Sequence, residues 1–296
     1  MSGLVSRFSP AIAGALVALL NAGVATAQNN FVDDGKPAAN APKVSIRNLA
    51  PDTVTSWVTD RITGDDFLQA DMGPGPVMSD IKNPYIPNGG GRQPTYRIAD
   101  TTNPILQPWA KAQMEKENDR VREGKVPYIT RERCWPAGVP GYLVYTRVQP
   151  IHFAQTDRKI TIINELNTQV RHIYMDVAHT KDPKKSWYGE SVGHYEGEEL
   201  VIDTIGLNDK TFVDNYRTPH TDKIHVVERW KLVEDGKILQ VTATVEDPGT
   251  FTTPWKAVQR FKRISRPLEE YLCEPSNDGY FSYDVVPLPK ADKADF

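Results

Sequence analysis

The amino-acid sequence predicts a mainly β protein, an antiparallel up-and-down barrel of about eight or nine strands with an N-terminal extended arm and one amphipathic helix. From about residue 150 onward, short runs of alternating apolar and polar residues follow one another, as in strands that bury one face. Turn sequences such as Asp157-Arg158 and Asp235-Gly236 separate the runs. A meander of this kind can close into a barrel, which leaves no open edge. The predicted strands are Ile151–Gln155, Lys159–Asn164, Val170–Met175, Trp187–Tyr195, Leu200–Ile205, Ile224–Val233, Ile238–Val245, Trp255–Lys262 and Glu269–Cys273.

Composition divides the chain into five segments. The first carries Arg7, an apolar run and Ala25-Thr26-Ala27, which together are typical of a signal peptide that is cleaved near Ala27. The Pro- and Gly-rich part after it predicts an extended arm. Asn103-Pro104 predicts the start of a helix over 104–123. The segments are the signal peptide (1–27), the arm (28–102), the helix and a linker (103–133), the barrel domain (134–280) and a C-terminal tail (281–296).

Charge and hydropathy exclude several classes of partner. The chain has 35 Lys and Arg against 38 Asp and Glu, which gives no electrostatic reason to expect nucleic acid or an anionic membrane surface. The apolar run of the signal peptide is shorter than the roughly 20 residues of a membrane-spanning helix, so no membrane insertion is expected. We therefore expect a periplasmic or secreted protein. In such a compartment Cys134 and Cys273 are expected to form a disulfide.

Three charged residues interrupt apolar rows of the predicted strands. Arg171, Asp203 and Glu228 each lie in a row whose other members are mostly apolar. If these rows face one interior, the barrel encloses two carboxylates and one guanidinium, which must pair or shift their pKa values. Together with His220, which lies just before the Glu228 strand, they predict a catalytic group for proton transfer and charge stabilisation. The alternative is a structural buried ion pair.

Further side chains are candidates for contacts to a small organic ligand: Tyr174, His194, His225, Trp230 and Trp255. No organic cofactor is expected and no metal site is assigned, because the sequence has neither H-E-x-x-H nor paired C-x-x-C motifs. Whether His220 and His225 bind a metal stays open. Gly189-Glu190-Ser191-Val192-Gly193 matches the G-x-S-x-G of serine hydrolases, but a turn and a strand are expected after it where the hydrolase needs a helix.

The segment from Cys134 to Asn277 resembles a widespread family of exported bacterial proteins, and the resemblance implies no established reaction. The N-terminal arm is outside it, and the likeness of the meander to lipocalin-type barrels is one of architecture alone. The motifs that carry the resemblance are Arg133-Cys134-Trp135-Pro136, Arg171-His172-Ile173-Tyr174-Met175-Asp176, Gly189-x-Ser191-x-Gly193-His194-Tyr195-Glu196-Gly197, Leu200-Val201-Ile202-Asp203-Thr204, Pro219-His220-x5-Val226-Val227-Glu228-Arg229 and Asp247-Pro248-x5-Pro254-Trp255.

Four functions are compatible with these patterns. The first is a cofactor-independent enzyme of the lyase, isomerase or hydratase type, acting on a small aromatic or terpenoid-like molecule in the barrel. The second is a non-catalytic, lipocalin-like binding protein for such a molecule. The third is an envelope-assembly or interaction module whose N-terminal arm binds a partner protein. The fourth is a serine hydrolase that uses Ser191.

Overall fold

The computed structural model describes residues 36–37, 39–63, 65–70, 74–84, 97–125, 129–130, 134–144, 149–271 and 273. These residues belong to one compact unit. The predicted signal peptide over 1–27 and the predicted tail over 281–296 lie outside the described residues. No helix in the described part of the chain is long and apolar enough to span a membrane.

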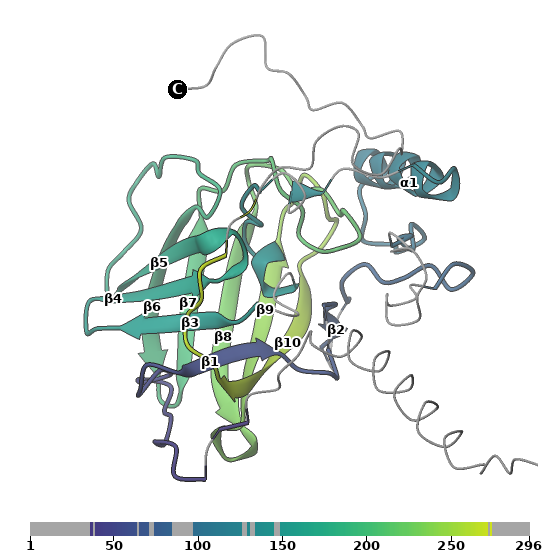
Figure 1. Ribbon diagram of the computed structural model, residues 1–296. Coiled ribbons are helices and arrows are strands. Elements are labelled where there is room, and N and C mark those ends of the chain that lie inside the picture. Colours follow the sequence, from purple (N-terminus) through teal and green to yellow (C-terminus); the bar gives the residue numbers. More distant parts are fainter. Residues whose placement is uncertain are drawn as a thin grey trace, which may run out of the picture. The chain divides into compact units, whose positions relative to one another are not determined.

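Nine of the ten strands close into a barrel, which confirms the predicted fold class (Figure 1). Neighbouring barrel strands are antiparallel except β5 and β6, which run parallel over a short stretch. The order around the barrel is β1-β3-β4-β5-β6-β7-β8-β9-β10, and β10 pairs back with β1. The strands are β1 (Thr55–Thr59), β3 (Ile151–Gln155), β4 (Lys159–Asn164), β5 (Gln169–Met175), β6 (Glu190–Glu196), β7 (Glu199–Ile205), β8 (His225–Val233), β9 (Ile238–Glu246) and β10 (Trp255–Ser265); the short β2 (Leu68–Gln69) pairs with β10.

The barrel begins earlier in the chain than the sequence predicts. Strand β1 lies in the predicted arm, and it closes the sheet by pairing with β10 along its whole length and with β3 at Trp57. All five of its residues are buried, so it lacks the alternation that identifies a half-exposed strand. At the other end, β10 stops at Ser265, and the predicted last strand at Glu269–Cys273 is not formed among its described residues.

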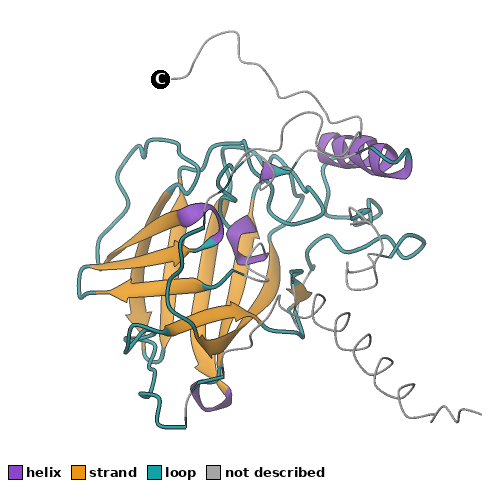
Figure 2. Ribbon diagram, viewed as in Figure 1, coloured by secondary structure: helices purple, strands orange, loops and turns teal. Residues whose placement is uncertain are grey.

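The one α-helix among the described residues, α1 (Pro108–Arg122), starts at Pro108 rather than at Pro104 (Figure 2). The backbone before it is engaged elsewhere, because Leu106 forms an isolated β-bridge with Phe251. Pro108 suits the first turn of a helix, where its missing N–H leaves no bond unmade. The buried residues of α1 are Ala110, Met114 and Asn118, which recur every four positions, whereas Trp109 is 43% exposed.

Large side chains fill the centre of the barrel. Trp57, Trp230 and Phe261 are all 0% exposed. The rings of Trp230 and Phe261 stack with their centroids 6.0 Å apart, and Phe153 meets Trp230 edge-on at 5.9 Å. The middle of the barrel is therefore a packed core.

The described residues include three short 3-10 helices, of which η5 (Glu234–Gly236) joins β8 to β9; the other two and a disulfide complete the barrel. One of these helices, η3 (Gly141–Val144), is buried at all four residues and carries Tyr142 into the core. The other, η4 (Leu166–Thr168), joins β4 to β5. Cys134 and Cys273 form the predicted disulfide and close a loop of 139 residues. The bond ties the chain before η3 to the chain after β10.

Candidate functional site

The barrel encloses a buried ion pair, as the row pattern predicts for two of the three charged residues. An Nη2 atom of Arg171 on β5 lies 2.5 Å from Oε2 of Glu228 on β8. Tyr142 from η3 completes the group: its hydroxyl donates to Glu228 Oε1 at 2.8 Å and accepts from Arg171 Nη1 at 2.6 Å. The exposed fractions of Arg171 and Glu228 are 3% and 0%.

Two hydroxyls occupy the remaining donors of the guanidinium. Nε and Nη2 of Arg171 each lie 3.2 Å from Ser191 Oγ, and Nη2 donates to Thr204 Oγ1 at 2.8 Å. Burial raises the pKa of Tyr142 well above its ordinary value. Burial alone lowers the pKa of Arg171, but the Glu228 carboxylate outweighs it and the pKa is raised. Tyr142 therefore stays protonated and Arg171 stays charged near neutral pH, and the buried group acts as a structural anchor of the core.

Ser191 belongs to this buried network. Its hydroxyl contacts Arg171 and Thr204 Oγ1, at 2.9 Å for the latter, and the residue is 2% exposed. A serine nucleophile needs an imidazole or another base at its hydroxyl. A strand, β6, also follows where the hydrolase needs a helix. The geometry therefore does not support the serine hydrolase hypothesis.

Asp203 does not join Arg171 and Glu228 in the interior. Strand β7 carries apolar residues on both faces, and the row that points inward is Leu200, Ile202 and Thr204. Asp203 lies in the other row and its side chain is 38% exposed. The expectation of three charged residues around one interior is wrong for Asp203, because alternation cannot identify the inward face of a strand whose two rows are both apolar.

On the outside of the barrel, Asp203 instead belongs to a chain of four side chains, which we call the His-Asp chain: Glu190, His179, Asp203 and His225. Oδ1 of Asp203 lies 2.8 Å from Nε2 of His225 and 3.2 Å from Nε2 of His179. His179 Nδ1 lies 3.0 Å from Glu190 Oε1. Hydrogen bonding to Asp203 raises the pKa of His225, and the same bond lowers the pKa of Asp203. The sequence did not assign His179 or Glu190 to a site, because His179 lies in the loop between β5 and β6 and reaches Glu190, at the start of β6, only in the folded chain.

His220 does not lie beside Glu228 as a general base. It is 3% exposed, with Nε2 at 2.7 Å from Thr211 Oγ1 and Nδ1 at 3.0 Å from the carbonyl oxygen of Thr221. A backbone carbonyl can only accept, so Nδ1 carries the proton and Nε2 accepts from the threonine. Burial lowers the pKa of His220, which keeps the imidazole neutral. It is a core residue of the loop between β7 and β8.

The other predicted contact residues are dispersed. Tyr174 is 49% exposed on the outer face of β5, and His194 faces solvent on β6, where it pairs with Glu196 at 2.9 Å. Trp230 and Trp255 are 0% and 1% exposed in the core. Within the described ranges no group of three His, Cys, Asp or Glu side chains could hold a metal ion.

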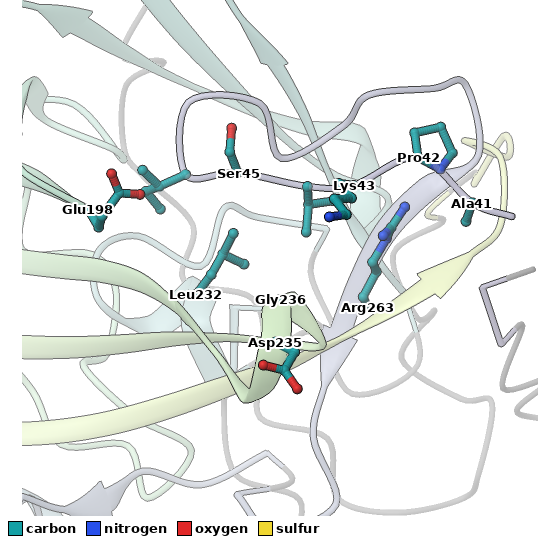
Figure 3. A pocket seen from close by; sticks show the side chains of 11 residues that line it. Ala41, Pro42, Lys43, Ser45, Glu198, Leu232, Asp235, Gly236 and Arg263 are labelled. Atoms are coloured by element: carbon teal, nitrogen blue, oxygen red, sulfur yellow. The ribbon is translucent and has the colours of Figure 1, made fainter. Parts of the chain in front are cut away.

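A cavity of about 520 Å³ lies at one end of the barrel, which we call the mouth pocket (Figure 3). Two of its residues continue inward-facing rows: Leu232 follows Trp230 on β8, and Arg263 follows Phe261 on β10. The stacked Trp230 and Phe261 rings therefore form the layer below, and the pocket is the open end of the barrel above this packed core. It is lined by residues 41–46, Glu198, Leu232, Asp235, Gly236 and Arg263.

The chain over 41–46 covers this end of the barrel and is fixed by specific bonds. Gln155 on β3 donates from Nε2 to the Ile46 carbonyl at 3.0 Å and accepts at Oε1 from the Leu49 N–H at 2.6 Å. Trp57 Nε1 donates to the Leu49 carbonyl at 3.0 Å. Ile46 and Leu49 are buried. The covering segment is therefore anchored at its C-terminal side to the barrel wall.

Comparison of the chain with models of known protein families, with curated proteins and with solved structures gives no match in any of the three. The candidate sites are therefore assessed on their own geometry.

Removing one partner of the buried pair should destabilise the fold strongly. Arg171→Met leaves the Glu228 carboxylate buried without its cation, and we expect the free energy of unfolding to fall by about 3–5 kcal/mol. Replacing both residues by Met should recover part of this loss, because no uncompensated charge remains. Urea unfolding followed by tryptophan fluorescence measures both. The matched control is Arg229→Met on the outer face of β8, which should cost less than about 1 kcal/mol; equal losses for the two single variants would contradict a buried pair.

The His-Asp chain predicts a pH effect in the neutral range. In the folded chain the pKa of His225 is above 6.5, so the folded state holds this proton more tightly than the unfolded state. Its contribution to stability is therefore complete below pH 6.5 and is lost as pH rises through the folded pKa. Asp203→Asn should lower the pKa of His225, measured by NMR titration of its ring protons, and should remove this contribution. An unchanged His225 titration in the variant would refute the pairing, and exposed His172 on β5 provides the control signal.

Proposed function

We propose that the protein is a non-catalytic, lipocalin-like binding protein that holds a small, partly apolar organic molecule in the mouth pocket. The observation that carries this proposal is the division of the barrel into a filled centre and a hollow end. Pockets of a few hundred Å³ in the mouths of β-barrels are a common kind of ligand site. The volume of about 520 Å³ lies in that range.

The lining of the mouth pocket supports a ligand with both apolar and polar parts. Val44, Ile46 and Leu232 supply apolar surface, while Lys43 and Arg263 supply hydrogen-bond donors. The covering segment closes one side, so a bound molecule is shielded without entering the packed core. In contrast, the Arg171–Glu228 pair is fully satisfied by its neighbours and offers no free group to a substrate.

We also propose that the protein works in the periplasm or outside the cell. The disulfide between Cys134 and Cys273 supports an oxidising compartment, and the signal-peptide pattern over 1–27 gives the route. Binding of a partner protein by the N-terminal arm stays a prediction. The part of the arm over 46–59 already forms contacts with the barrel, so a partner would have to bind elsewhere on the arm.

Filling the mouth pocket tests the proposal. Leu232→Trp places a larger side chain in the pocket, and we expect it to abolish the thermal stabilisation that small aromatic or terpenoid compounds give the unaltered protein, since a native-state ligand must raise the melting temperature. Leu268→Trp is the matched control, because Leu268 is 48% exposed and outside the pocket. The proposal fails if no compound stabilises the unaltered protein, or if Leu232→Trp responds as strongly as the control.

An acid–base enzyme is a second candidate, and the His225–Asp203 bond favours it. A carboxylate that holds one ring nitrogen of a half-exposed histidine leaves the other nitrogen available to solvent as a general base. If the stabilising compounds are converted, His225→Gln should lower kcat about 100-fold or more. His172→Gln, on the outer face of β5, should leave kcat unchanged. Full turnover in His225→Gln would exclude this site.

A further inference from the structure

We infer that the ligand of the mouth pocket is a monoanion, a carboxylic acid with an apolar body whose carboxylate binds between Arg263 and Lys43. This inference rests on the proposed function and adds the chemical class of the ligand.

Arg263 lines the mouth pocket with a guanidinium that has an unsatisfied hydrogen-bond donor. Its Nη2 donates to Thr55 Oγ1 at 3.1 Å, but its Nε–H is buried and has no hydrogen-bond partner among the residues that the structure describes. Within the described part of the chain, no carboxylate forms an ion pair with Arg263. Because Nε is shielded from solvent, a ligand in the pocket has to reach the guanidinium through its Nη atoms. A carboxylate matches the planar fork of a guanidinium better than any neutral acceptor does.

Lys43 supplies a second positive charge on the same side of the pocket. It comes from the covering segment, whereas Arg263 comes from the end of β10, and Figure 3 shows the two side chains together at one end of the pocket. No carboxylate among the described residues forms an ion pair with Lys43. Asp52 interacts electrostatically with Arg263 but forms no ion pair with it, so two cations line the pocket without a paired carboxylate, and an anion placed between them is stabilised by both.

The rest of the lining limits the charge of the ligand. Leu232 lies between the cationic end and Glu198, which stands across the pocket (Figure 3). The carboxylate of Asp235 points away from Arg263 in the same view. An apolar body therefore fits against Leu232, and a second negative charge would meet Glu198. A hydroxyl or amine at the far end of the ligand could instead donate to that carboxylate.

Matched pairs of acids and alcohols test the inference. The probes are octanoate with 1-octanol and 4-phenylbutyrate with 4-phenylbutanol, titrated by calorimetry into the full-length mature protein. We expect each acid to bind at least about tenfold more tightly than its alcohol, since a charge-assisted hydrogen bond is worth this much. Raising the salt concentration should reduce the preference, because Lys43 is exposed and its attraction is screened.

Charge-removing variants locate the carboxylate. Lys43→Gln and Arg263→Gln should each lower the affinity for the acids about tenfold and leave the affinity for the alcohols unchanged. Lys256→Gln is the control, because Lys256 lies on the outer face of β10 and outside the pocket. Lys43 is exposed, so its variant remains informative if Arg263→Gln does not fold.

The outcomes separate this inference from the proposed function. If acids and alcohols bind equally well and Leu232→Trp abolishes both, the pocket binds ligands but the carboxylate site is refuted. If Lys43→Gln and Lys256→Gln bind the acids equally well, the carboxylate site is also refuted. If no probe binds the unaltered protein and no library compound stabilises it, the proposed function fails as well.

Discussion

Closure of the sheet by β1 is the constraint on which the rest of the structure depends. Because β1 pairs with both β10 and β3, no barrel strand is left with an open edge, and every strand must direct one row of side chains to the same axis. The inward rows of β8 and β10 meet as the stacked pair Trp230 and Phe261, which blocks the middle. Above the next inward residues, Leu232 and Arg263, the described part of the chain places only the covering segment over 41–46. The hollow end of the barrel follows directly from this geometry.

The charged side chains discussed above form two groups, one buried in the barrel and one accessible to water on its outside. Inside, Arg171 and Glu228 form a buried ion pair that is hydrogen-bonded to three hydroxyl-bearing neighbours, Tyr142, Ser191 and Thr204. Outside, His225 and Asp203 are half exposed and share a proton-bearing bond whose strength depends on pH. The first arrangement anchors the core, whereas the second responds to pH through His225.

The sequence predicted those features that follow from alternation along a single strand. The inward positions of Arg171 and Glu228 belong to this class, because on β5 and β8 a buried inward row contrasts with a more exposed outer row. Strand β1 was missed since all its residues are buried, and Asp203 was assigned to the wrong face since both faces of β7 are apolar. The mouth pocket brings together residues 41–46 and Arg263, which are more than two hundred positions apart. No local pattern can reveal such a contact.

At the proposed binding site, the covering segment affects the residence time of a ligand and its equilibrium affinity differently. Its anchors at Gln155 and Trp57 hold the side near Ile46 and Leu49, while Lys43 and its neighbours toward the N-terminus lie nearer the rim. A ligand in the mouth pocket would leave past the covering segment. If a ligand binds there as proposed, its residence time depends on residues 41–45, which lie between the pocket and solvent, whereas its equilibrium affinity depends on all the residues that line the pocket. Substitutions in the covering segment can therefore change the residence time of a ligand without changing the ligand specificity of the pocket.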